Sequence, residues 1–146
     1  MIVLDLIGCR SEVFFIRPDL TVFDTARYLR DHQLRSVGVL DEGGRPVGVV
    51  SQSDISNKVA AENTCPAWLR VSEIMTTELV IVTPDRSLDD CLRLMEQNNI
   101  YHLLVVDGGG MYRGMLSVRD LLSVIASDEK SRADMLASFV LDGRSA

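Results

Sequence analysis

Two short segments carry the residue types best suited to chemistry: GVVSQSD at residues 48–54 and GMLSVRD at residues 114–120. In each, an aspartate follows a serine by three positions, the spacing with which a hydroxyl and a carboxylate cap the first turn of a helix. The same groups suit a nucleotide, because a helix start attracts phosphate and an ionised aspartate can accept both hydrogens of a ribose cis-diol. Each serine–aspartate pair can therefore serve either as a helix cap alone or as part of a ligand-binding site. The pairs are Ser51 with Asp54 and Ser117 with Asp120.

Both segments belong to an internal repeat with an offset of 66 residues. Without any gap, Pro18 pairs with Pro84 and Gly48 with Gly114, and the apolar stretch VFFI overlies LVIV. The register holds from about residue 12 to residue 60 of the first copy. Similarity at a fixed period indicates a duplicated structural unit, so the two motifs are expected at equivalent places in two related folds.

Each repeat is predicted to fold as strand, helix, strand, strand, helix. The apolar runs at 13–16 and 79–82 are rich in β-branched or aromatic residues, as is typical of buried strands. Thr21 and Ser87 each stand three positions before an aspartate and ahead of apolar residues at helical spacing, which indicates a capped helix. Glycine-rich turns then join two further strands, and the second helix begins at the serine of each motif.

A repeat of roughly 50 residues is too small to bury a good core alone, so the repeats are expected to pack face to face about a pseudo-twofold axis. This predicts an α+β fold, α/β sandwich-like in its layers, with two βαββα repeats and a C-terminal helix. The expected parts are a first repeat at 1–60, a connecting segment at 61–72, a second repeat at 73–126 and a helical tail at 127–146. Within the connecting segment, Pro66 and Trp68 are expected to cover a sheet edge.

Composition and charge argue against several classes of function. No apolar run approaches the roughly 18 residues that span a bilayer, and no basic segment leads into a hydrophobic amino terminus, so a cytoplasmic protein with no membrane segment is expected. The net charge of −6, from 21 acidic and 15 scattered basic residues, disfavours nucleic acid as a partner. No Ser/His/Asp set and no metal-ligand spacing is present, so neither catalysis nor a metal site is expected. The isolated cysteines and histidines are Cys9, Cys65, Cys91, His32 and His102.

This layout resembles the tandem cystathionine β-synthase domain, the CBS pair or Bateman module. The resemblance is carried by the two G-h-h-S-x-x-D segments, by strands ending in VLD or VVD before a glycine turn, by IRPD and VTPD ahead of each first helix, and by VSEIMTT before the second repeat. It covers about residues 1–126, and stand-alone bacterial proteins of this kind are the most similar. The resemblance implies an adenosine-containing ligand in the clefts between the repeats and association into dimers.

The resemblance also implies roles for the motif residues. It places ribose contact on Asp54 and Asp120, and phosphate contact on Ser51 and Ser117. Arg119, whose counterpart in the first motif is a serine, can pair with phosphate bidentately or remain a solvated surface residue. We expect the second motif to hold polyphosphate more tightly than the first.

An adenine pocket is implied on the middle strand of the repeat opposite each motif. An aromatic side chain there can stack on a purine or serve packing alone. The expected neighbours of Asp120 are Arg35, Ser36 and Val37, and those of Asp54 are Tyr101, His102 and Leu103.

Together these features predict a non-catalytic, homodimeric energy or redox sensor. Its regulatory ligand is expected to be AMP, ADP, ATP or NAD(H), with no obligatory cofactor, and the sequence does not indicate the protein that receives the signal. The alternative is a purely structural homodimerisation or protein-interaction module, in which the S-x-x-D segments act only as helix caps.

Overall fold

The computed structural model describes residues 1–8, 10–125 and 137 of the 146-residue chain. The elements in chain order are α1 (Val3–Ile7), β1 (Phe15–Ile16), α2 (Val22–Asp31), β2 (Ser36–Leu40), β3 (Pro46–Ser51), α3 (Gln52–Ile55), the π-helical turn η1 (Ser56–Ala60), the 3₁₀ turns η2 (Pro66–Trp68) and η3 (Val71–Glu73), β4 (Ile81–Val82), α4 (Leu88–Asn98), β5 (His102–Val106), β6 (Tyr112–Ser117) and α5 (Val118–Ile125). The predicted order of strand, helix, strand, strand, helix is confirmed in both repeats.

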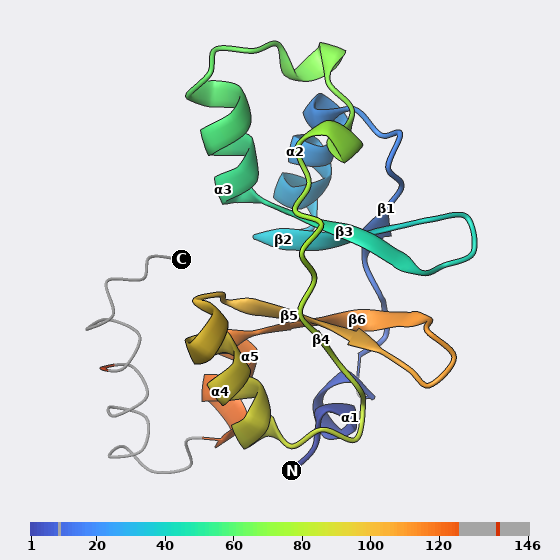
Figure 1. Cartoon of the computed structure of the whole chain (residues 1–146), viewed down its shortest axis with the longest axis vertical. Helices are drawn as coiled ribbons and strands as arrows, with labels where there is room; N and C mark the ends of the chain where they lie inside the picture. The colour runs from blue at the N-terminus through green and yellow to red at the C-terminus, as the bar shows by residue number, and fades with distance from the viewer. Residues whose placement is uncertain (9, 126–136, 138–146) are drawn as a thin grey trace.

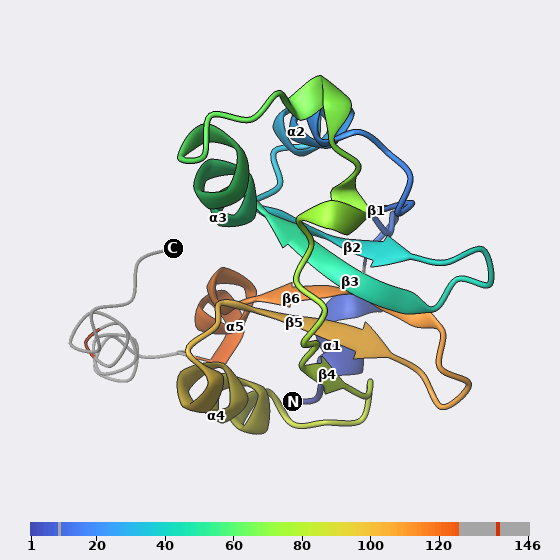
Figure 2. The ribbon, with the colours of Figure 1, turned by 45° about the horizontal axis from the view of Figure 1, so that its top comes forward.

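The two repeats meet through their sheets. The strand orders are β1-β2-β3 and β4-β5-β6, and in each sheet the outer first strand runs parallel to the middle strand while the third runs antiparallel. Figures 1 and 2 show the sheets facing each other in the middle of the molecule, with α2 and α3 outside one sheet and α4 and α5 outside the other. The predicted α+β fold of two packed βαββα repeats is confirmed.

Equivalent positions of the repeats build equivalent cores. In the first repeat, Val22 and Leu29 of α2 pack with Val37 of β2, and the same offset of 66 residues gives the second core. All six side chains are at most 2% exposed. The helical apolar period and the strand pattern therefore predicted the inward faces correctly. The second set is Leu88, Met95 and Leu103.

The segment that precedes each repeat packs on the other repeat. Val3 and Ile7 of α1 lie in the core of the second repeat, whereas Val71 and Ile74 lie in the core of the first. The sequence patterns did not predict α1, whose backbone joins the second repeat through a hydrogen bond from Val3 N–H to the carbonyl of Arg86 at 2.9 Å. This exchange carries the residues that follow α1 across to the second serine–aspartate motif.

Two expectations about the linking segments have different outcomes. Trp68 in η2 is 86% exposed, so it does not cover a sheet edge as expected. The helix predicted within 127–146 lies outside the described residues.

Within the described part of the chain, no helix combines the length and apolar character needed to cross a membrane.

Candidate functional site

Both serine–aspartate motifs form reciprocal caps at a strand-to-helix junction. The Asp54 N–H donates to Ser51 Oγ at 3.1 Å, and Ser51 N–H donates to Asp54 Oδ2 at 3.0 Å. At the second motif, the corresponding distances between Asp120 and Ser117 are 3.1 and 2.9 Å. The predicted local geometry is therefore present twice, and each carboxylate is held at the start of its helix.

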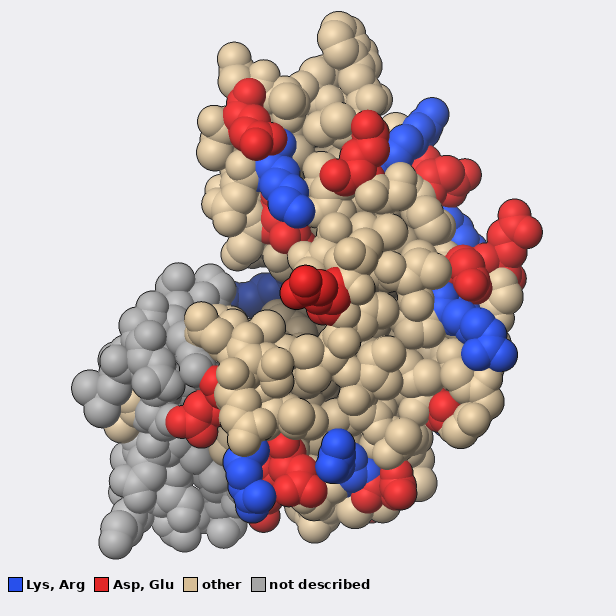
Figure 3. Space-filling view, viewed as in Figure 1, with Lys and Arg blue, Asp and Glu red and all other residues tan. Residues whose placement is uncertain are grey.

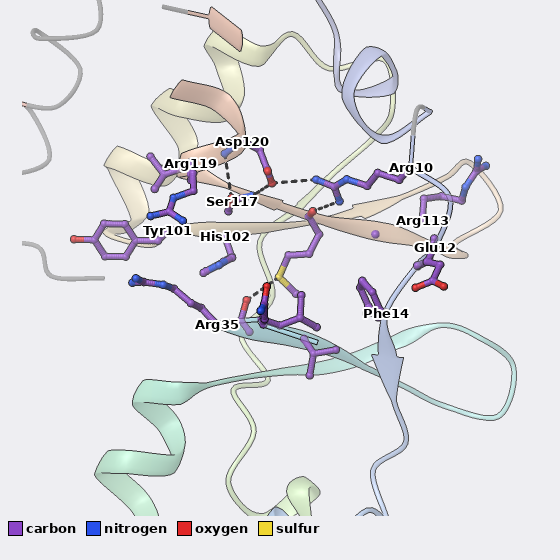
Figure 4. A pocket seen from close by; sticks show the side chains of 18 of the residues that line it. Arg10, Glu12, Phe14, Arg35, Tyr101, His102, Arg113, Ser117, Arg119 and Asp120 are labelled. Carbon is purple, nitrogen blue, oxygen red and sulfur yellow. Dashed lines mark hydrogen bonds and ion pairs between the residues drawn. The ribbon is translucent and has the colours of Figure 1, made fainter. Parts of the chain in front are cut away.

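A pocket of about 880 Å³ lies between the repeats at the second motif. Ser117, Arg119 and Asp120 line it from the second repeat. Figure 3 shows the surface hollowed between the two repeats, with a basic side chain inside the hollow. Figure 4 shows Asp120 and Ser117 on one wall and Arg35, from the start of β2, on the opposite wall. A pocket of several hundred cubic ångströms matches the size of small-molecule sites.

The structure brings some of the expected adenine-pocket residues to the place assigned to them. The first-repeat residues expected near Asp120 line the same pocket as that carboxylate. Ser36 is buried, and its hydroxyl contacts the Met115 thioether at 3.3 Å. These residues are Arg35, Ser36 and Val37.

The residues expected near Asp54 are placed differently. Tyr101 and His102 line the Asp120 pocket, because His102 at the start of β5 is the register partner of Ser117 at the end of β6. Leu103, the next residue, points to the opposite face of the sheet and is fully buried in the core of the second repeat. Leu103 is not among the residues that line the Asp120 pocket.

The pocket wall carries an excess of positive charge. Four arginines line it against two carboxylates, Glu12 and Asp120. In Figure 4, Arg35 and Arg119 lie toward one end of the pocket and Arg10 and Arg113 toward the other. Arginine forks match phosphate oxygens in bidentate geometry, so this wall favours an anionic ligand.

Arg10 is the site residue that sequence reasoning missed. Its Nη2 lies 3.0 Å from Asp120 Oδ2, and its Nη1 donates to the carbonyl of Met115 at 2.5 Å. A usable signal was present, because the repeat offset aligns Arg10 with Thr76 in the VSEIMTT segment that precedes the second repeat. The division of the chain at residues 60 and 73 assigned Arg10 to the first repeat, away from the motif that it contacts.

The first motif has different surroundings. Thr76 Oγ1 donates to Asp54 Oδ1 at 3.4 Å. A Cβ added at Gly48 would collide with the Met75 thioether, so Gly48 serves close packing. Its counterpart Gly114 lines the large pocket and has φ +138, a backbone conformation that favours glycine. The Asp120 pocket does not include Asp54 among its lining residues.

His102 lines the pocket with an imidazole that is neutral at physiological pH. Burial lowers the pKa of its imidazole to about 4; the Asp120 carboxylate opposes this shift, and Arg35 adds to it. A neutral imidazole offers one N–H donor and one acceptor nitrogen. His102 can therefore hydrogen-bond a polar ligand edge without adding charge.

This burial predicts a loss of stability in mild acid. The unfolded chain protonates His102 near its ordinary pKa of 6.5, whereas the folded chain does so only near 4, so the contribution of His102 is complete above pH 6.5 and falls as pH drops toward 4. The His102→Gln variant should lose about 1 kcal/mol less than the wild type between pH 6.5 and 5.5. Urea unfolding at both pH values measures this difference, and equal losses in the two proteins would contradict it.

Among residues 1–8 and 10–125, no group of three histidine, cysteine, aspartate or glutamate side chains is arranged to hold a metal ion. The site therefore consists of a carboxylate at a helix start, a cationic wall and a neutral histidine.

The chain belongs to the CBS-domain family, whose family model matches residues 3–61 and 71–127. A 17.7 kDa protein of Acidianus ambivalens is 31% identical over 111 residues, which cover 76% of this chain and 66% of that protein. Two further archaeal relatives, from Methanopyrus kandleri and Methanocaldococcus jannaschii, are matched over 59% and 37% of their lengths. The chain thus spans two thirds or less of these curated relatives.

Solved structures share the fold over most of their length. A protein with CBS domains from Burkholderia ambifaria has a TM-score of 0.80 at 26% identity, with 88% of this chain and 96% of that chain covered. The CBS domain pair of protein MJ0100, solved in complex with 5′-methylthioadenosine and S-adenosyl-L-methionine, has a TM-score of 0.76 at 23% identity. The match covers 86% of this chain and 95% of the MJ0100 chain.

Proposed function

We propose that this chain is a regulatory module that binds an adenosine-containing nucleotide in the pocket between its CBS repeats. The observation that carries the proposal is the placement of Asp120 at a helix start inside a pocket of about 880 Å³ with four arginines on its wall. Adenosine compounds in the MJ0100 pair support the adenosine half of the proposal. The arginines support the phosphate half, because they attract anions.

Each part of the nucleotide has a candidate partner. The Asp120 side chain is 37% exposed and acceptor-only when ionised, so its oxygens suit the two ribose hydroxyls. Phosphate is assigned to Ser117 and Arg119, where the start of α5 adds the positive end of the helix dipole. Adenine is assigned to Arg35 and His102, which line the same pocket from the first and the second repeat respectively.

The charge of the pocket ranks the candidate ligands. S-adenosylmethionine carries a sulfonium cation and methylthioadenosine carries no charge, so neither compensates the excess of arginine over carboxylate on the pocket wall. AMP, ADP, ATP and NAD(H) do, and we place them ahead of both thio compounds. We assign the Asp120 pocket as the main site. Asp54, with Thr76 and Met75 beside its motif, is the second site, for a ligand of lower charge.

Ligand binding regulates only if it favours one arrangement of the repeats or subunits over another. The pocket is built from both repeats, so a bound nucleotide would bias their packing. We further propose that the module is non-catalytic, acts in the cytoplasm as a homodimer and reports energy or redox state. Light scattering after size-exclusion chromatography tests the dimer, and a monomer at working concentration would contradict it.

A thermal-shift panel tests the binding proposal. At about a hundredfold excess over Kd, a ligand adds about 2.7 kcal/mol of stability, which raises the melting temperature by roughly 5–10 °C. We expect ADP or ATP to give such a shift and S-adenosylmethionine and methylthioadenosine to give a smaller one. A larger shift from S-adenosylmethionine than from every nucleotide would contradict the charge argument.

The complete caps at both motifs favour a second candidate function. Ser51 with Asp54 and Ser117 with Asp120 satisfy backbone donors whether or not a ligand binds. A structural homodimerisation module would need nothing more from them. That function predicts a flat thermal-shift panel together with an intact dimer.

A further inference from the structure

We propose that Arg10 makes the Asp120 pocket selective for phosphorylated adenosine compounds over unphosphorylated ones. The inference rests on the proposed function, because it assumes that ribose binds Asp120. It adds a specificity-determining residue that comes from outside both serine–aspartate motifs. Figure 4 shows the Arg10 guanidinium joined to the same carboxylate that the ribose would need.

The ion pair competes directly with a ribose diol. Asp120 Oδ2 already accepts from Ser117 N–H at 2.9 Å and lies 3.0 Å from Arg10 Nη2. A diol that takes both carboxylate oxygens must share Oδ2 with these donors or displace the guanidinium. The Arg10 side chain is 31% exposed, and among the described residues its printed contacts are Asp120 and the Met115 carbonyl, so it can turn within the pocket once these two are broken.

Displacement has different consequences for two classes of ligand. A nucleoside that binds the Asp120 carboxylate through its ribose breaks the ion pair with Arg10 and offers the Arg10 guanidinium no other anion. A nucleotide brings its own anion, so the freed guanidinium can pair with phosphate in the same pocket. Arg10 therefore weakens nucleoside binding and strengthens nucleotide binding, and these opposite signs distinguish selectivity from a general structural role.

The first repeat contains a matched position with a neutral side chain. Thr76, the counterpart of Arg10, contacts Asp54 through its hydroxyl at 3.4 Å. Its backbone pairs with Val49, which is the counterpart of Met115, with N–O distances of 2.9 and 2.8 Å. At the second motif, the carbonyl of Met115 accepts instead from the Arg10 side chain. The same position of the repeat is thus compatible with a neutral threonine, and the positive charge of Arg10 is particular to the second motif.

Calorimetric titration of wild type and Arg10→Thr with ADP, adenosine and 5′-methylthioadenosine tests the inference. Arg10→Thr should weaken ADP binding by about tenfold, because a charge-assisted contact is lost. It should strengthen adenosine and methylthioadenosine binding by about threefold, the scale of a partly exposed ion pair that no longer has to be broken. Arg10→Lys should keep most of the preference for ADP.

The outcomes separate this inference from the proposed function. If ADP and adenosine bind the wild type but Arg10→Thr changes both affinities in the same direction, the role of Arg10 is contradicted while the site stands. If none of the three compounds binds the wild type at millimolar concentration, the proposed function fails and the inference fails with it. Arg10→Gln, closer in size to arginine, replaces Arg10→Thr if the melting temperature shows that the threonine variant is unfolded.

Discussion

Alanine in place of Asp120 should weaken ADP binding by about 10- to 150-fold. The carboxylate is the only group assigned to the ribose hydroxyls, and hydrogen bonds to a charged group contribute about 1.5–3 kcal/mol. The same substitution removes the acceptor for Ser117 N–H, so unfolding free energy should also fall by about 1 kcal/mol. Calorimetric titration measures the first effect and urea unfolding the second.

Asp54→Ala is the matched control for this prediction. It removes the equivalent cap at the first motif, where Asp54 accepts from Ser51 N–H at 3.0 Å. A similar loss of stability is therefore expected, with little change in ADP affinity at the Asp120 pocket. Equal ADP binding by wild type and Asp120→Ala would contradict the ribose assignment and leave Asp120 with a capping role only.

Alanine in place of Gly38 should destabilise the fold by about 2–3 kcal/mol. A Cβ at this position in β2 would lie 2.8–2.9 Å from ring atoms of Tyr112, closer than real contacts allow. Tyr112 is 9% exposed and packs with Leu40 and Leu104 between the two sheets, so its ring has little room to yield. Overpacking of a tight interior typically costs about 1–3 kcal/mol.

Gly108 supplies a control for the glycine prediction. An added Cβ there meets nothing within 4 Å, and Gly108 is not among the glycines with positive φ. Gly108→Ala should change stability by less than about 1 kcal/mol, and the restriction of the unfolded chain favours a small gain. Midpoints of urea unfolding compare the two variants. Equal midpoints would mean that Tyr112 does not pack against Gly38 as the structure shows.

Tyr112 and Gly38 also explain why the repeats pack as they do. The repeat offset pairs Gly38 with the larger Leu104, and Pro46 with the larger Tyr112. At both positions the second repeat therefore has the bulkier side chain. The large ring of one repeat therefore fills the space left by the glycine of the other. Burial raises the pKa of the Tyr112 phenol above its ordinary value, which agrees with a side chain enclosed between the sheets.

The fold was predictable because its signals are local and duplicated. Ser87 caps α4 by accepting from Asp90 N–H at 3.1 Å, as the spacing indicates, and Met95 lies in the core about two turns later. The strand expected at 13–16 is shorter in the structure, since only Phe15 and Ile16 pair with β2. Helix α1 has five residues and an isoleucine at its N-cap, so it carries no sequence signal and depends on packing against the second repeat.

The pocket was only partly predictable because it depends on long-range geometry. Asp120 and Arg35 were expected together and both line it. The Arg10 contact joins residues 110 positions apart, through a segment exchange that no local pattern records. The family resemblance implies a place for His102 near Asp54, whereas the register of β5 and β6 sets His102 opposite Ser117 in the Asp120 pocket.

A crystal structure of the protein with ADP tests most directly whether an adenine nucleotide binds between the repeats with its ribose on Asp120. We expect one ADP between the repeats, with both ribose hydroxyls within hydrogen-bonding distance of the Asp120 carboxylate and the phosphates against Arg10 or Arg119. Density for ADP elsewhere on the surface, with Asp120 still paired to Arg10 at millimolar ligand, would contradict it.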